Sequence, residues 1–315
     1  MFVYFSKKDY GLFCNGILIS LWKVDLMVKN SVENAGKFEF DKDFVVNRLG
    51  YGTMQLTGKG VWGAYKDPQQ AVDLIKNAFD LGVNFVDTAD SYGPWEADTY
   101  LAQALKEYPD SDKIFISDKV GQVRTGPNEW IPLGRPEFLR QEVELSLRKF
   151  GRDHEDLLFL HRIDSQVPIE DQVGELKKLQ DEGKIKHIGI SQVTLDELKA
   201  AQKIAKIDAV ENMYNVGHHK DDDAIVDYTK EQKIAFLPWF PLDTGHLAKD
   251  DGPLADIAKK YNASPAQIAL AWLLKRSDNI IPIPGTSSLA HLKDNLESAD
   301  VSLSDADFEK LSSLE

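Results

Sequence analysis

Four side chains that follow short apolar runs form a set suited to proton transfer. Asp87 and Tyr92 follow one run, Lys119 follows the next, and His161 follows a third. A tyrosine phenol has a pKa of about 10, and a neighbouring ammonium stabilises the phenolate and lowers that value. We expect Asp87 to keep Lys119 charged and His161 to orient the substrate oxygen. The set predicts protonation of a carbonyl oxygen by Tyr92, with the hydride supplied by a bound cofactor.

Two other chemistries are open at these residues. A barrel lyase would form a Schiff base through Lys119, but Asp87 should keep this amine protonated and therefore a poor nucleophile. His218 and His219 precede three aspartates, 221–223, without the ligand spacing of a zinc site. We interpret that cluster as a loop followed by a helix cap, and we predict no metal site.

The segments that must position these side chains alternate between short apolar runs and helical patterns. Apolar residues recur at intervals of three and four over 68–81, where Asp67 and Pro68 supply an N-cap and a first-turn proline. Eight such units predict a (β/α)8 TIM barrel with its chemistry at the C-terminal ends of the strands. An open doubly wound sheet is the alternative, but the glycine fingerprint it would carry after the first strand is missing. The expected strands are 48–52, 83–86, 113–117, 157–160, 185–190, 207–210, 234–238 and 280–283.

Additional segments are expected at both ends of the barrel. The runs 37–41 and 44–47 predict an N-terminal β-hairpin at the barrel floor, and 304–312 predicts a trailing C-terminal helix. We assign 37–315 to one barrel domain and 1–36 to an extension that is disordered or separate from the barrel. The charge-free run 10–22 is shorter than the roughly 20 residues that a membrane-spanning helix needs.

The composition is that of an acidic globular protein. The 315 residues are 43% hydrophobic and include 37 Lys+Arg against 51 Asp+Glu, for a net charge of −14. This balance excludes long disordered repeats and argues against binding to nucleic acid, which requires clustered cations. The single cysteine, Cys14, allows no internal disulfide, which is typical of a reducing compartment. We therefore expect a cytoplasmic protein with a small-molecule partner and no nucleic-acid or membrane partner.

Six stretches, in chain order, resemble the aldo-keto reductase superfamily from about residue 38 to the C-terminus. They are RLGYGTM at 48–54, VNFVDTADSYG at 83–93, LHR at 160–162, HIGIS at 187–191, VENMYN at 210–215 and IPGTSS at 283–288. The glycine-threonine-serine ending is most similar to a bacterial subgroup that includes pyridoxal reductases. The resemblance implies NADPH-dependent reduction of an aldehyde or ketone, with a catalytic tetrad of Asp87, Tyr92, Lys119 and His161. It also implies cofactor contacts from Gly52, Thr53, Met54, Ser191, Gln192, Glu211, Trp239, Phe240, Pro241, Leu242, Gly285, Thr286, Ser287, His291, Lys293 and Asn295.

This sequence departs from the family pattern at two cofactor positions. Glu211 stands where the family has glutamine, and a carboxylate accepts hydrogen bonds from the nicotinamide amide but cannot donate to its oxygen. Gln192 stands where asparagine is usual. The stretch that should meet the adenosine 2′-phosphate contains His291 and Lys293 but no arginine. These departures leave open a second function, a cofactor-bound redox sensor or partner subunit with little turnover.

Three further residues are candidates for substrate contact. Trp62 and Trp95, on the first two loops, are placed to wall a flat substrate, although ordinary loop packing would use the same residues. Arg162 is suited to an anionic group, or to an ion pair with Asp164 or Glu170.

Overall fold

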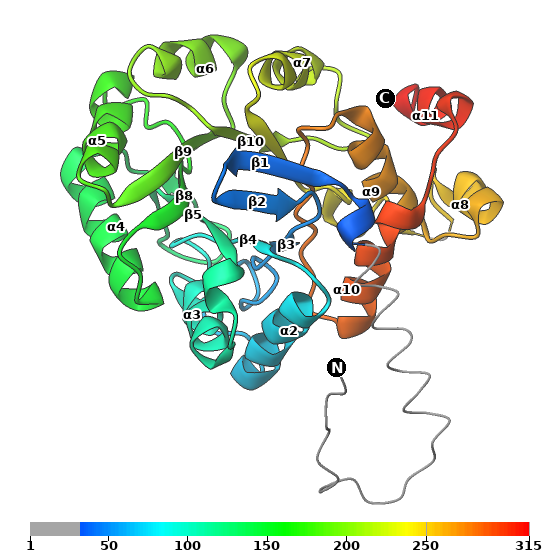
Figure 1. Cartoon of the computed structure of the whole chain (residues 1–315), viewed down its shortest axis with the longest axis horizontal. Helices are drawn as coiled ribbons and strands as arrows, with labels where there is room; N and C mark the ends of the chain where they lie inside the picture. The colour runs from blue at the N-terminus through cyan, green and yellow to red at the C-terminus, as the bar shows by residue number, and fades with distance from the viewer. Residues whose placement is uncertain (1–31, 250, 315) are drawn as a thin grey trace, which may run out of the picture.

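The computed structural model describes residues 32–249 and 251–314 (Figure 1). Segment 1–26, and all but the last few residues of the predicted extension 1–36, lie outside the described residues. The described part alternates between strand and helix along its length. Its strands are β1 (Lys37–Asp41), β2 (Phe44–Asn47), β3 (Tyr51–Gly52), β4 (Phe85–Asp87), β5 (Phe115–Val120), β6 (Gln122–Val123), β7 (Ile131–Pro132), β8 (Glu155–Leu160), β9 (Ile185–Ser191), β10 (Ala209–Met213) and β11 (Ala235–Trp239).

Helices surround the central strands on the outside of the molecule (Figure 1). They are α2 (Pro68–Asp80), α3 (Glu96–Glu107), α4 (Pro136–Phe150), α5 (Ile169–Asp181), α6 (Leu195–Gln202), α7 (Asp223–Glu231), α8 (Ala255–Tyr261), α9 (Pro265–Arg276), α10 (Leu289–Leu296) and α11 (Asp305–Ser312). None of the described helices combines the length and apolar character needed to span a membrane.

The central sheet is parallel, curled and seven-stranded, in the order β11-β10-β9-β8-β5-β4-β3. Its strands are buried on both faces, as their continuous apolar runs predict. Inside the curl, apolar side chains from alternate strand positions pack together, among them Phe85, Phe115 and Phe159. Gly189 lies against the ring of Phe159 in this interior. A Cβ at this position would lie 2.4 Å from that ring, so a larger residue would clash.

The eighth expected strand, 280–283, forms only isolated bridges instead of a regular ladder. Ile280 bridges Phe236 of β11, and Gly285 bridges Gly52 of β3, so the segment contacts both edges of the sheet. Pro282 and Pro284 lack an N–H to donate, which explains why regular pairing stops there. The structure therefore shows a curled sheet with both edges touching one proline-rich segment.

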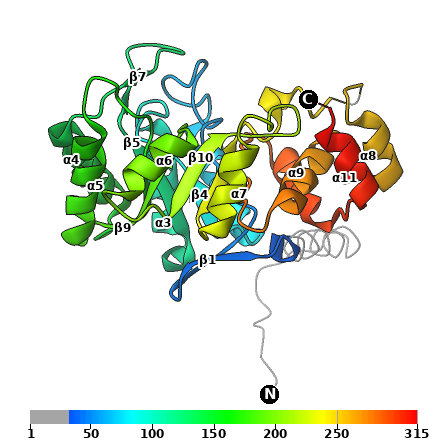
Figure 2. The same cartoon turned by 90° about the horizontal axis from the view of Figure 1, so that it is seen from above.

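The predicted hairpin has the predicted bounds and covers one end of the sheet (Figure 1). Phe38, Phe40 and Phe44 pack against the interior phenylalanines. His187 anchors the hairpin because its Nε2 lies 3.1 Å from an Asp41 carboxylate oxygen and its Nδ1 lies 3.2 Å from one of Asp208. Figure 2 shows β1 at the opposite end of the molecule from β7, so the loops that follow the strands open at the uncovered end.

Candidate active site

Parallel register brings the predicted catalytic side chains to the same end of the sheet. Asp87 is the last residue of β4 and His161 directly follows β8, while Glu211 lies in β10 opposite Ser191 of β9. The expected position of Lys119 just after a strand is wrong. The structure places it inside β5, which runs on to Val120 because it continues to pair with β8.

Lys119 and Asp87 form a buried ion pair at the base of the site. Lys119 Nζ lies 2.5 Å from Asp87 Oδ2 and donates to the carbonyl oxygen of Thr88 at 2.9 Å, and its side chain is fully buried. Ser117 Oγ donates to the other oxygen of Asp87 at 2.9 Å. Burial opposes the charge of Lys119, but Asp87 and Glu211 outweigh it and raise the pKa of this lysine. The amine is therefore held as an ammonium.

Tyr92 lies above this ammonium. Lys119 Nζ is 5.3 Å from the centroid of the Tyr92 ring, and the ring centroids of Tyr92 and His161 are 6.0 Å apart. The expectation that Lys119 brings the pKa of the phenol below its usual value is wrong for this structure. Burial raises the pKa of Tyr92, and the ammonium offsets this only in part, while Asp87 and Glu211 add to the increase.

His161 is neutral and held by a hydroxyl group. Its Nδ1 lies 3.2 Å from Ser91 Oγ. Burial, followed by the nearby charges of Arg162, Lys119 and Arg124, lowers the pKa of His161 well below its usual value.

Glu211 brings a second carboxyl group to the same lysine. Its Oε2 lies 3.4 Å from Lys119 Nζ and is buried without a hydrogen-bond partner among the described residues. Burial, and next the charge of Asp87, raise the pKa of Glu211 to about 8, against the opposing effects of Lys119 and Arg162.

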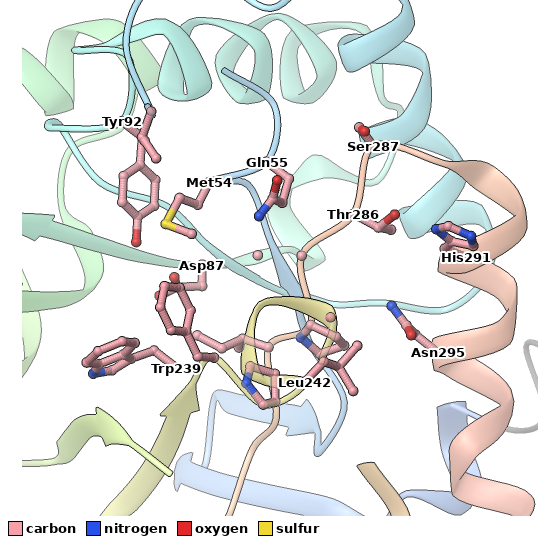
Figure 3. Close-up of a pocket in the computed structure, with 18 of the residues that line it drawn as sticks. Met54, Gln55, Asp87, Tyr92, Trp239, Leu242, Thr286, Ser287, His291 and Asn295 are labelled. Carbon is pink, nitrogen blue, oxygen red and sulfur yellow. The ribbon is translucent and has the colours of Figure 1, made fainter. Parts of the chain in front are cut away.

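A cavity of about 980 Å³ opens beside these groups. Figure 3 shows Asp87, Tyr92 and Trp239 on one side of it and Thr286, Ser287, His291 and Asn295, on and before α10, on the other. Ser288 caps the N-terminus of α10, and its side chain accepts from the backbone N–H of His291. The cavity therefore joins the buried ion pair to a helix N-terminus, a site that favours anions.

Most predicted cofactor residues line this cavity. They are Gly52, Met54, Glu211, Trp239, Phe240, Pro241, Leu242, Gly285, Thr286, Ser287, His291 and Asn295. Arg162 also lines it; instead of pairing with Asp164 or Glu170, it donates at 2.8 Å to Ser191 Oγ, and its guanidinium lies 5.7 Å from the Trp239 ring centroid.

The remaining predicted residues lie around the cavity without lining it. Thr53 and Ser191 are buried behind it, Gln192 accepts a hydrogen bond from the indole of Trp239 at 2.9 Å, and Lys293 is on α10. Among the described residues, Trp62 and Trp95 are not part of its wall. Trp62 lies 5.9 Å from the guanidinium of Arg124 and Trp95 lies 5.2 Å from Lys149 Nζ, which is the packing alternative considered above.

Several lining residues were not predicted. Gln55, Ser264, Pro265, Ala266 and Asp294 line the cavity. Ser264 forms the capping box of α9 with Gln267, and Pro265 is the first residue of that helix, so both give a helix-start signal and none for a cavity. Ser264 Oγ donates to Asp294 at 2.7 Å, a contact across 30 residues that no local pattern shows.

The described residues contain no group of three or more His, Cys, Asp or Glu side chains able to hold a metal ion.

Comparisons with known proteins agree with this architecture. Residues 48–315 match the aldo/keto reductase family. The chain is 44% identical over 269 residues to an uncharacterised oxidoreductase of Schizosaccharomyces pombe, covering 85% of this chain and 87% of that protein. It is 42% identical over 266 residues to pyridoxine 4-dehydrogenase of Escherichia coli, covering 82% and 92%. An aldo-keto reductase of Klebsiella pneumoniae, solved in complex with NADPH, shares the fold with a TM-score of 0.73 at 21% identity, covering 86% and 91%.

This chain belongs to the aldo/keto reductase family. It is an NADP-dependent oxidoreductase that acts on carbonyl groups, as predicted from the sequence. The predicted likeness to the subgroup that includes pyridoxal reductases is also confirmed.

Proposed function

We propose that this enzyme reduces an aldehyde with NADPH, with Tyr92 as the proton donor and Asp87, Lys119 and His161 as its partners. The observation that carries the proposal is the buried Asp87–Lys119 pair beneath the Tyr92 ring, next to neutral His161 and open to the cavity. When bound, NADPH supplies the hydride to the carbonyl carbon.

The residues present suit a dinucleotide. The cavity has the volume of a ligand site and runs from the catalytic groups to the N-terminus of α10. The buried, unpartnered Oε2 of Glu211 offers a polar group where the family holds the nicotinamide amide. Thr286 and Ser287 offer hydroxyls at the helix end, where a phosphate is favoured.

Each catalytic side chain then has one task. Tyr92 transfers its proton to the developing alkoxide, and Lys119 stabilises the phenolate that remains. His161 uses Nδ1 for Ser91, so Nε2 is the nitrogen that holds the carbonyl oxygen in place. A Schiff base on Lys119 is not favoured because its raised pKa keeps this amine protonated.

For the substrate, we propose a pyridoxal-like aldehyde. The 42% identical relative is a pyridoxine 4-dehydrogenase, and Arg162 lines the cavity beside His161, where it suits an ionised substituent on an aromatic ring. We further propose that residues 37–315 form one barrel, closed by segment 280–285 between β11 and β3. We also propose that the enzyme works in the cytoplasm.

A Tyr92→Phe variant tests the mechanism. Removing one phenol oxygen should lower kcat for pyridoxal about 10²- to 10⁴-fold, while NADPH still quenches tryptophan fluorescence with an unchanged Kd. Tyr100→Phe is the matched control, because Tyr100 is another buried tyrosine, hydrogen-bonded to Glu96, outside the cavity lining. Turnover of the Tyr92→Phe variant within a few-fold of wild type would remove Tyr92 from the mechanism.

A further inference from the structure

Arg124 lies at the junction of three loops on the substrate side of the cavity. Its guanidinium donates to carbonyl oxygens of Gly60, Val61 and Ser91 at 2.9, 2.7 and 2.9 Å. It also donates to those of Gly126 and Glu129, at 3.3 and 2.7 Å. These carbonyls belong to the loops that follow β3, β4 and β5, so one side chain joins all three.

The same guanidinium supports a tryptophan at the cavity. Its central carbon lies 3.5 Å from the ring centroid of Trp130, which places the two planar groups in a stack. Trp130 lines the cavity, and its ring centroid is 6.4 Å from that of Tyr92 and 6.3 Å from that of His161. The indole therefore forms part of the wall directly beside the two groups that meet the carbonyl oxygen.

Arg124 also holds a strained residue in that wall. Val61 lines the cavity with a φ of 53°, a left-handed conformation that is uncommon for a β-branched residue. Such strain persists only where surrounding contacts impose it. Here the Val61 carbonyl accepts from Arg124, and the preceding Gly60 carbonyl accepts from Arg124 and from the Asn128 backbone N–H.

These contacts distinguish Arg124 from an ordinary surface arginine. Arg124 is 8% exposed, and its five hydrogen bonds to described residues all go to backbone carbonyls. A lysine has three donors on a single nitrogen and no plane, so it cannot serve five acceptors on three loops or stack on the indole.

We propose that Arg124 is a positioning residue that holds Trp130 and Val61 as a preformed wall, and that this wall selects flat aromatic carbonyl substrates over small aliphatic ones. This inference rests on the proposed function. A rigid aromatic wall gains contact area with a planar ring and little with a short chain. Because the wall is held by Arg124 before substrate arrives, ordering it costs nothing at binding.

The test is the aromatic preference, defined as kcat/KM for pyridine-4-carbaldehyde divided by kcat/KM for propanal. Arg124→Lys should lower this ratio about five- to tenfold, the factor expected for losing an aromatic contact, mostly through a higher KM for the aromatic aldehyde. The Kd for NADPH should stay unchanged. Arg148→Lys, the same substitution on the exposed side of α4, is the matched control and should leave the ratio at its wild-type value.

Trp130→Ala provides a second route to the same answer. It should lower the ratio as Arg124→Lys does, and the double variant should lose little more, because both changes remove one wall. An unchanged ratio in Trp130→Ala would overturn the proposal, even if Arg124→Lys failed to fold. A wild-type protein that binds NADPH but reduces neither aldehyde would contradict the proposed function instead.

Discussion

Glu211 gives the site an ionisable carboxyl group where the family has glutamine, and the effect of replacing it on stability can be calculated. In the folded protein the pKa of Glu211 is raised from the ordinary 4.5 to about 8, mainly by burial and then by Asp87. A carboxyl with a raised pKa costs no stability while it is protonated in both states. The cost appears as the pH rises above the pKa of the unfolded state, and it is complete above the pKa of the folded state. Glu211→Gln removes this cost and keeps the size of the side chain.

The magnitude follows from the pKa shift. Each pH unit between the two values contributes about 1.4 kcal/mol, so the rise from 4.5 to about 8 amounts to about 4–5 kcal/mol. Near pH 5 the variant and the wild type should have similar free energies of unfolding. The variant should then gain steadily up to about pH 8 and keep a constant advantage above it.

Urea unfolding followed by tryptophan fluorescence between about pH 5 and about pH 9 measures this difference. Glu182→Gln is the control, because Arg140 and Lys184 hold the pKa of this exposed residue at about 2, so its difference from wild type should not change over the range. Parallel stability curves for Glu211→Gln and wild type would refute the reasoning. NADPH affinity gives a second view: Glu211→Gln should match wild type near neutral pH, where Glu211 is mostly protonated, and bind more tightly above about pH 8.

Two further predictions concern the sheet and its cover. His187→Gln should cost about 1–2 kcal/mol near neutral pH, because it weakens hydrogen bonds to Asp41 and Asp208. Burial alone would raise the pKa of Asp208, but its hydrogen bonds, first the one from His187, lower this pKa below the usual value. The pKa of Asp41 is also lowered. The stability they add is present above about pH 4 and is lost as pH falls further, so urea curves of variant and wild type should converge there. Gly189→Ala should cost about 1–3 kcal/mol in the same assay, because its Cβ would lie 2.4 Å from the Phe159 ring; an unchanged stability would contradict this packing.

The sequence predicted correctly those features of the structure that depend on residues within a single helix or strand. The helix predicted over 68–81 is observed as Pro68–Asp80, because Asp67 caps it and Pro68 suits its first turn. Asp87 and His161 were placed at one rim because parallel strands end on the same side.

The sequence predictions were wrong for features that depend on contacts between segments distant in the chain. The length of β5 depends on pairing with β8, so the sequence ended the strand before Lys119. The roles of Trp62 and Trp95 depend on Arg124, from another loop, and on Lys149, from α4. The pKa of Tyr92 is governed by burial, a property of the whole fold that the presence of a lysine does not reveal.

The protonation pattern of the site explains why the phenol should be the acid despite its raised pKa. Lys119 is held as an ammonium by the carboxylate of Asp87, so giving up its proton would leave this buried charge unpaired. His161 is neutral and engaged at Nδ1, so it can orient an oxygen but has no readily lost proton. Tyr92 remains, and an alkoxide product is far more basic than a phenolate, so transfer from Tyr92 runs downhill. The phenolate that forms then lies beside Lys119, where the ammonium is worth more than it would be in water.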